Sequence, residues 1–416
     1  ATVTVTPYVA PNQPPVATDD PEYSVDNDDI LTITISDLVS NDTDADGDAL
    51  TITSVSSPVG GTVELVTPAG VATDDPTPIS VDGYGGINGE TGNVGGGQMS
   101  ADGRYVLVTN PNPHNYGSEP HILRKDLLTG EMKPVDVDAQ GNVGTGGSQR
   151  AIDISADGRF VLFTLDAYGD VNLDPNAPAD QGNQTGPLFR KDMDTGAIVR
   201  VDVLSDGSYV TPSWRAESAK MSADGNVVVF EHPNTEYAGL EKVGHGHVYH
   251  KNLTTGELQV VDIQPDGSVS DNRASDGGYG IDVSDDGSIV SFFSTRGSDG
   301  TDLVDGVDVS ASESLYVRDM SITSGTPITL ANAAEDGTPS DNNSYGSGAV
   351  LSGDGQFVAF TSGAGNLVAG VSGGPQVYVK NLSTGEVVVA SSAADGTAGN
   401  AFSAIGSMSF SANGRY

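Results

Sequence analysis

The chain has 416 residues, of which 36% are hydrophobic, and its 57 Asp and Glu against 18 Lys and Arg give a formal net charge of −39 at pH 7. This charge argues against nucleic acid phosphate or an anionic lipid surface as a partner. The lack of cysteine excludes disulfides, thiolate zinc sites and cysteine nucleophiles. No apolar run reaches about 18 residues, so we expect no membrane insertion. The 54 Gly and 22 Pro favour short strands joined by turns, and the expected class is all-β.

The chain starts with the segment ATVTVTP, whose alternation predicts a strand that stops at Pro7. We interpret residues 1–11 as the closing strand of a preceding repeat and a linker, so the chain is expected to be a piece of a longer tandem protein. The alternative is that Thr2–Thr6 pairs with the domain that follows.

Alternating strands such as DILTITIS and ALTITSVSS come next and predict a β-sandwich. The loop between them, NDTDADGDAL, has carboxylates at positions 1, 3 and 5 of a calcium-type loop and glycine at position 6, counted from Asp42. Thr53 stands where an EF-hand needs its closing acid, so we expect a Ca²⁺ ion with a ligand from elsewhere. A solvated acidic turn is the alternative. The candidate ligands are Asp42, Asp44, Asp46 and Asp48, joined by Asp19 or Asp20.

Four segments of this stretch, NQPPVATDD, DILTITIS, NDTDADGD and GGTVEL, resemble the bacterial cadherin-like and Ig-like repeats that occur in tandem in very large secreted adhesins. The resemblance implies a small Ig-like or cadherin-like β-sandwich over residues 12–70 and a secreted, extracellular or cell-surface location. Members of that family continue past GTV with further strands, whereas here a different repeat begins.

From residue 79 onward, a hairpin motif occurs six times, in which a hydrophobic residue and Ser run into a turn that ends in Gly. Each full copy continues into an apolar strand, a variable insertion, a second strand with a turn such as FRKDMDTGA, and a last strand. These pieces predict a blade of four antiparallel strands. The Thr-Gly turn joins strands three and four, because glycine accepts the positive φ that such a turn needs. The glycines of the six hairpins are Gly103, Gly158, Gly225, Gly287, Gly355 and Gly414.

These motifs resemble the TolB-type, WD40-like repeat of bacterial β-propellers, which implies a propeller over residues 79–416. Such a resemblance implies a fold more than a function, because propellers host many unrelated activities. Six hairpins against five Thr-Gly turns predict six blades, with Ile79–Gly83 as a fourth strand that completes the last one. The sequence stops at Tyr416 inside blade six, so we expect a ring that is either left open or completed by further sequence.

Two insertions of the propeller carry oxygen-bearing side chains at regular spacing, at every second position in the first and every third in the second. Such spacing can gather oxygen ligands around a calcium ion, and plain polar loops are the favoured alternative. The residues are Asp170, Asn172, Asp174 and Asn176 in the first insertion and Asp299, Asp302, Asp305 and Asp308 in the second.

The segment GHGHVYHK contains the one histidine cluster of the sequence. On a strand, His245 and His247 share a face that suits Zn²⁺, but His250 falls on the opposite face. We therefore favour a surface or blade-edge role over a metal site.

Several basic residues precede the hairpins and are expected on the first strands, along a central channel. They are candidates for binding an anionic sugar or a carboxylate, although pairing with neighbouring Asp is the favoured alternative. Trp214 and Tyr279 are candidates for stacking on a sugar ring, with packing between blades as the commoner use of such residues. The basic residues are Arg150, Arg215, Lys220 and Arg273.

The sequence has no Gly-x-Ser-x-Gly elbow set between a strand and a helix, so no catalytic residues are predicted. We expect a non-catalytic, calcium-stabilised binding or structural module of a large secreted or cell-surface bacterial adhesin-like protein. Its expected partners are carbohydrate, a cell-surface protein or further copies of itself. The alternatives are a polysaccharide-active propeller enzyme, and a subunit of an extracellular filament or surface layer that assembles through Thr2–Thr6.

Overall fold

The computed structural model divides into two compact units, Ala1–Pro76 and Thr77–Tyr416. In the first unit the structure describes residues 16–18, 38 and 41–43. In the second unit it describes residues 98–110, 121–137, 149–165, 173, 187–209, 218–232, 246–264, 266–268, 280–294, 303–304, 306–307, 309, 313–322, 328–342, 344–371, 374–393, 397–399 and 410.

In the first unit, Val16 and Thr43 form an antiparallel bridge. The Val16 N–H donates to the Thr43 carbonyl at 2.7 Å, and the Thr43 N–H donates back at 3.0 Å. The Thr18 N–H donates to Asp42 Oδ1 at 2.7 Å, and the Asn41 side-chain amide donates to the Thr18 carbonyl at 3.3 Å. The segment that ends at Thr18 therefore lies against the start of the acidic loop.

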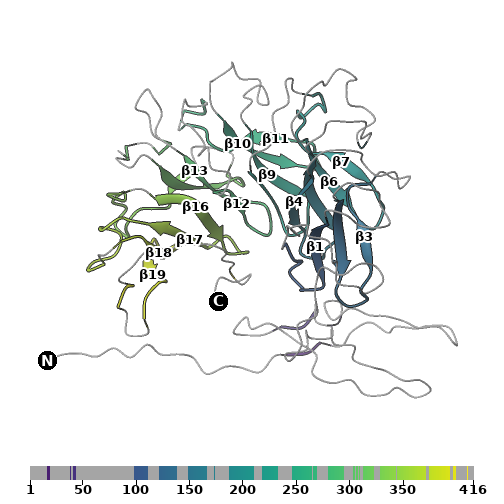
Figure 1. Ribbon diagram of the computed structural model, residues 1–416. Helices are drawn as coiled ribbons and strands as arrows, with labels where there is room; N and C mark the ends of the chain where they lie inside the picture. Colours follow the sequence, from purple (N-terminus) through teal and green to yellow (C-terminus); the bar gives the residue numbers. More distant parts are fainter. Residues whose placement is uncertain are drawn as a thin grey trace. The chain divides into compact units, whose positions relative to one another are not determined.

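The second unit contains nineteen strands in five antiparallel sheets, counted over the residues that the structure describes (Figure 1). In each sheet, every strand pairs with the next one in the chain. We call the sheets blades 1 to 5. Blade 1 comprises β1 (Tyr105–Asn110), β2 (His121–Asp126) and β3 (Met132–Pro134), and blade 2 comprises β4 (Gln149–Ile154), β5 (Phe160–Leu165), β6 (Leu188–Asp192) and β7 (Ile198–Arg200). Blade 3 comprises β8 (Ser218–Met221), β9 (Val227–His232), β10 (His247–Asn252) and β11 (Leu258–Val260). Blade 4 comprises β12 (Asp282–Val283), β13 (Ile289–Ser294), β14 (Ser314–Asp319) and β15 (Ile328–Leu330), and blade 5 comprises β16 (Ser344–Leu351), β17 (Phe357–Ser362), β18 (Gln376–Asn381) and β19 (Val387–Val389).

This succession of antiparallel blades confirms the expected all-β propeller. In blade 1, an isolated bridge between Met99 and Val106 stands in the place of a first strand. The expected number of six blades stays a prediction. Of the sixth hairpin the structure describes Phe410, which packs against Ala359 and Val377 of blade 5.

The hairpin motif folds around its serine and aspartate. In blade 2, the Ser155 hydroxyl donates to Asp157 Oδ1 at 2.6 Å and accepts the Phe160 N–H at 2.8 Å. Gly158 follows with a φ of 73°, which explains why the turn ends in glycine. The bond from serine to aspartate recurs in all five hairpins that the structure describes, at Ser100, Ser155, Ser222, Ser284 and Ser352.

The Thr-Gly turns join strands three and four, as predicted. In blade 2, Asp192 Oδ1 accepts the N–H groups of Asp194 and Thr195 at 3.0 and 3.3 Å, and Gly196 closes the turn with a φ of 76°. A short polar side chain at the end of strand three thus caps the turn.

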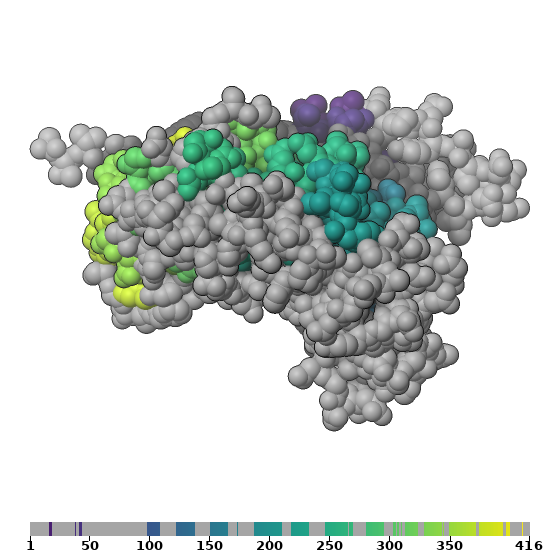
Figure 2. Space-filling model, turned by 90° about the horizontal axis from the view of Figure 1, so that it is seen from above, coloured from purple at the N-terminus to yellow at the C-terminus, as the bar shows by residue number. Residues whose placement is uncertain are grey.

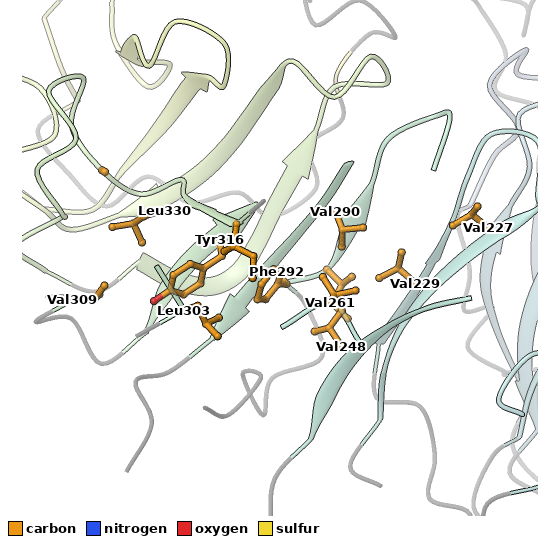
Figure 3. Packing of buried hydrophobic residues seen from close by; sticks show 13 residues of the cluster. Val227, Val229, Val248, Val261, Val290, Phe292, Leu303, Val309, Tyr316 and Leu330 are labelled. Atoms are coloured by element: carbon orange, nitrogen blue, oxygen red, sulfur yellow. The ribbon is translucent and has the colours of Figure 1, made fainter. Parts of the chain in front are cut away.

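Buried apolar side chains fill the space between successive blades. Figure 3 shows the cluster shared by blades 3 and 4, in which Val227 and Val229 of β9 pack with Val290 and Phe292 of β13. Leu303, from the insertion between β13 and β14, is fully buried in the same cluster. Burying a side chain of this size stabilises a fold by about 1.5–3 kcal/mol, so these contacts hold each blade to the next.

Candidate functional site

The hairpins of neighbouring blades are joined by backbone hydrogen bonds. In each, the N–H of the residue after the motif serine donates to the carbonyl at the same place in the next blade. The bonds run from Ala101 to Ala156 (3.0 Å), from Ala156 to Ala223 (2.9 Å), from Ala223 to Asp285 (3.0 Å) and from Asp285 to Gly353 (2.8 Å). The five hairpins thus form one continuous belt through blades 1 to 5.

Hairpin glycines pack on a side chain of the preceding blade. A Cβ atom added at Gly158 would lie 2.1 Å from the Tyr105 ring, and one added at Gly287 would lie 2.7 Å from a Val227 methyl group. The Gly158 carbonyl also accepts a bond of 2.6 Å from Arg124 Nη1. The blades therefore meet too closely here for a larger residue.

His250 occupies in blade 3 the place that Arg124 occupies in blade 1, and its Nε2 lies 2.9 Å from the Gly287 carbonyl of blade 4. This contact confirms the blade-edge role for His250. For His247 the expected surface location is wrong: the ring is fully buried, with Nδ1 2.8 Å from Asp262 Oδ2. The start of strand three lies inside the blade, against the end of strand four, and this position buries the ring. His245 lies outside the described residues.

A buried lysine or arginine on the third strand caps the end of the preceding blade. Lys191 donates to the Pro134 and Val137 carbonyls at 3.2 and 3.0 Å. Lys380 donates to the Ala333 carbonyl at 2.8 Å, and burial lowers the pKa of Lys380 to about 8. These side chains use their charge to satisfy carbonyl groups at a blade boundary. Lys251 and Arg318 make equivalent contacts in blades 3 and 4.

Blades 2 and 3 also meet at the end of the fourth strand. Lys251 Nζ lies 3.1 Å from the Val203 and Leu204 carbonyls, and the Leu258 N–H donates to Ser205 Oγ at 3.0 Å. In the space-filling view, the teal atoms of blade 2 adjoin the greener atoms of blade 3 (Figure 2).

Three charged residues take the same position on successive first strands, immediately before the hydrophobic residue of the hairpin. Asp153 is on β4, Lys220 on β8 and Asp282 on β12, and we call them the Asp–Lys–Asp row. Asp153 Oδ2 accepts the Met221 N–H at 3.0 Å, and Asp282 Oδ2 accepts the Leu351 N–H at 2.8 Å. Each carboxylate thus joins its own blade to the next one.

The charges of the row are coupled. The negative charge of Asp153 raises the pKa of Lys220, and Asp282 adds to this effect. Burial raises the pKa of Asp282 to about 6, against the attraction of Lys220. All three side chains are half-buried, so the row is partly desolvated while it stays accessible.

Of the four basic residues expected on the first strands, the structure describes Arg150 and Lys220, and both lie on a first strand. Lys220 is on β8 between the strands of Asp153 and Asp282, and Arg150 is exposed on β4, opposite Thr164 in the register. The remaining candidate binding residues lie outside the described residues, at Trp214, Arg215, Arg273 and Tyr279.

Asp42 is the described member of the predicted calcium loop, and it bonds to Thr18. Within the described part of the chain, His, Asp and Glu side chains form no group of three that could hold a metal ion. Leu173 and Leu303, which belong to the two acidic insertions, are buried in the propeller. The other calcium candidates lie outside the described residues, at Asp19, Asp20, Asp44, Asp46, Asp48, Asp170, Asn172, Asp174, Asn176, Asp299, Asp302, Asp305 and Asp308.

Sequence reasoning misses Asp153, Asp282 and the cations of the third strands. Their signal is present in the repeats. DIS, KMS and DVS begin three of the hairpins, and RKD, HKN and VKN end four of the third strands. The contact partners lie in a neighbouring blade, and a single repeat read by itself does not contain them.

Comparison with known families gives a match to the N-terminal part of the chain. Residues 12–83 match the bacterial Ig domain family. The match confirms the expected Ig-like domain, and it extends past residue 70 to include Ile79–Gly83, which the sequence assigns to the propeller. No curated protein matches the chain. Among the residues that the structure describes, no helix is long and apolar enough to cross a membrane.

Several solved propellers are similar to this chain. TolB from Acinetobacter baumannii is 15% identical, with a TM-score of 0.37, over 71% of this chain and 56% of that one. The β-propeller domain of the trilobed protease from Pyrococcus furiosus is 14% identical, with a TM-score of 0.40, over 71% and 68% of the two chains. An oligogalacturonate lyase in complex with manganese is 15% identical, with a TM-score of 0.38, over 70% and 63%. The chain thus spans little more than half the length of the Acinetobacter protein.

Proposed function

We propose that the chain is a non-catalytic binding or structural module of a large secreted or cell-surface bacterial protein of adhesin type, and that calcium stabilises its Ig domain. One observation carries the assignment to a scaffold. The recurrent Ser, Asp, Lys and Arg side chains of blades 1 to 5 bond to the chain itself, in the hairpins and across the blade boundaries. The proposed partners of this scaffold are carbohydrate or a protein of a cell surface.

The calcium part of the proposal is supported by the contacts of Asp42. Asp42 Oδ1 accepts the Thr18 N–H, and the bridge between Val16 and Thr43 fixes the two segments side by side. Asp19 directly follows Thr18 in the sequence, and Asp20 comes next, so these two residues are the candidates that would complete the site. Oxygen ligands gathered from two segments suit the flexible coordination of Ca²⁺. We propose that Asp42, Asp44, Asp46 and Asp48 bind the ion together with Asp19 or Asp20.

Thermal unfolding of the whole chain in EGTA and in calcium chloride tests this site. An ion present at about 100 times its dissociation constant adds about 2.7 kcal/mol to the stability of the domain that binds it. For a domain of this size, the melting temperature should rise by roughly 10 °C or more. Asp44→Asn should abolish most of the rise. Asp266→Asn, in an exposed turn of the propeller, is the matched control and should leave it unchanged. A melting temperature that does not respond to calcium would refute the site.

Incubation with a panel of uronic-acid polysaccharides, with and without divalent metal, separates the scaffold from the enzyme alternative. We expect no release of new reducing ends above that of a heat-denatured sample. Sustained turnover by the purified chain would overturn the non-catalytic assignment, whatever the outcome for calcium.

A further inference from the structure

The Asp–Lys–Asp row sets opposite charges side by side on β4, β8 and β12. β8 packs against β4 and against β12, so Lys220 lies on the strand between the two that carry Asp153 and Asp282. The three side chains are half-buried, and part of each is accessible to a ligand.

The hydrogen bonds of the row leave capacity for a ligand. Each carboxylate accepts two backbone N–H groups, whereas an ionised carboxylate has room for about four such bonds. The donors are Ile154 and Met221 for Asp153, and Val283 and Leu351 for Asp282. The Lys220 ammonium group is attracted to both carboxylates but makes no hydrogen bond or ion pair with the side chains and carbonyl groups of the residues that the structure describes. Its three N–H donors therefore remain to be satisfied by solvent or by a ligand.

We propose that the Asp–Lys–Asp row binds neighbouring hydroxyl groups of a neutral sugar. A hydroxyl group donates one hydrogen bond and accepts others. Two adjacent hydroxyls can donate to Asp153 and Asp282 while their oxygen atoms accept from Lys220. The inference rests on the proposed binding role and names its ligand class.

The charges of the row disfavour the other classes of small ligand. An anion would be repelled by the two carboxylates of the row, in a chain of net charge −39. A divalent cation would be repelled by the Lys220 ammonium group. A zwitterion pairs with Lys220 and one carboxylate but leaves the second carboxylate desolvated without a new partner. A neutral polyol satisfies all three side chains.

Saturation-transfer NMR and isothermal titration of the whole chain test the proposal. The neutral probes are the methyl glycosides of mannose, glucose and galactose and their short oligomers, and galacturonate and diglycine are the anionic and zwitterionic probes. We expect at least one neutral probe to bind. Lys220→Met should weaken its binding about tenfold or more, because hydrogen bonds from a charged donor are lost. Lys220→Arg keeps a cationic donor and should retain most of the affinity.

Lys133→Met is the matched control. Lys133 lies on β3, the last strand of blade 1 and not a first strand, and its Nζ is 3.3 Å from the exposed Glu131 carboxylate. It should bind the neutral probe as the unaltered chain does.

The proposal is overturned if no neutral probe binds, if galacturonate or diglycine binds more tightly, or if a folded Lys220→Met chain binds equally well. Thermal unfolding checks the fold of each variant. Should Lys220→Met not fold, Lys220→Gln replaces it, with the same expected loss. None of these variants touches the Ig domain, so the calcium response decides that part of the proposed function independently.

Discussion

The blade boundaries are of two kinds, which differ in the side chain that the hairpin glycine packs on. This side chain is aromatic at the boundaries between blades 1 and 2 and between blades 2 and 3. It is aliphatic at the boundaries between blades 3 and 4 and between blades 4 and 5. In blade 1, the guanidinium groups of Arg104 and Arg124 lie 4.9 and 4.2 Å from the centroid of the Tyr105 ring. Val227 and Ile289 take the same position in blades 3 and 4. The backbone belt runs through all of these boundaries unchanged. Blade spacing is thus set by the backbone and the glycine, and the side chain beneath the glycine can be aromatic or aliphatic.

The two kinds of boundary are held together by different contacts beneath the glycine. Phe160 lies 4.8 and 4.4 Å from Arg159 and Arg190, and Arg190 also donates to the Gly225 carbonyl at 2.6 Å. A cation–π contact contributes about 0.5–2 kcal/mol, depending on desolvation. Burial of a Val or Ile side chain contributes about 1.5–3 kcal/mol without any charge. The contact beneath the glycine should therefore depend less on salt at the later boundaries than at the earlier ones.

Alanine at the hairpin glycines should give the largest effects, and Gly158, beneath which Tyr105 lies, should be more sensitive than Gly287. Gly158→Ala puts a methyl group 2.1 Å from the Tyr105 ring at a φ of +73°, whereas Gly287→Ala puts one 2.7 Å from the Val227 side chain. The left-handed backbone costs alanine about 1 kcal/mol, and the clash adds about 1–3 kcal/mol. We expect Gly158→Ala to lower the free energy of unfolding by about 3 kcal/mol and Gly287→Ala by less, as measured by urea denaturation.

Gly207→Ala controls for the backbone alone, because Gly207 has a φ of +81° and an added Cβ would have no neighbour within 4 Å. This variant should lose about 1 kcal/mol. Equal losses for Gly158→Ala and Gly207→Ala would mean that the ring moves aside without cost, and that the tight contact does not hold the blades together.

The fold was predictable from the sequence because its signals are local. The Ser155 hairpin and the turn at Gly196 are made by side chains that bond within a few residues, and each repeat contains the whole motif. The two carboxylates of the Asp–Lys–Asp row were not predictable in the same way. Asp153 and Asp282 act on strands of the following blade, and Lys191 acts on the preceding one, so their roles depend on the register between blades. The expected calcium loop, with Asp42 as its described member, remains a prediction.

The buried cations of the third strands offer a second contrast, because blade 5 has Lys380 where blade 4 has Arg318. Burial lowers the pKa of Lys380 from 10.5 to about 8, so between these two values the folded chain binds fewer protons than the unfolded chain. The free energy of unfolding should therefore rise with pH across this window, by on the order of 2 kcal/mol. Lys380→Arg stays protonated and should remove the rise.

Urea denaturation of both chains at several pH values across the window measures this difference. Other groups titrate equally in the two chains and cancel in the comparison. Parallel stability curves for the unaltered chain and Lys380→Arg would show that Lys380 keeps its ordinary pKa and that the cap on the Ala333 carbonyl is well solvated.

The smallest effect is expected at the Thr-Gly turns, which are capped by Asp192 in blade 2 and by Asn252 in blade 3. Asp192 also accepts a bond of 2.8 Å from Arg159, whereas Asn226 stands in the place of Arg159 in blade 3. The bond from Arg159 lowers the pKa of Asp192 below 3.8. Ionised Asp192 therefore adds stability above pH 3.8, which is lost as the pH falls further.

Asp192→Asn keeps an acceptor for the turn but removes the ion pair. Because the Arg159 side chain is 42% exposed, the loss at neutral pH should be about 1 kcal/mol or less. The difference from the unaltered chain should vanish in acid, as Asp192 becomes protonated. Asn252→Asp creates the same cap in blade 3 without an arginine, and it should gain no stability at neutral pH. A gain in stability there would show that a carboxylate strengthens the turn by itself. Arg159 would then not be the source of the stability that Asp192 adds in blade 2.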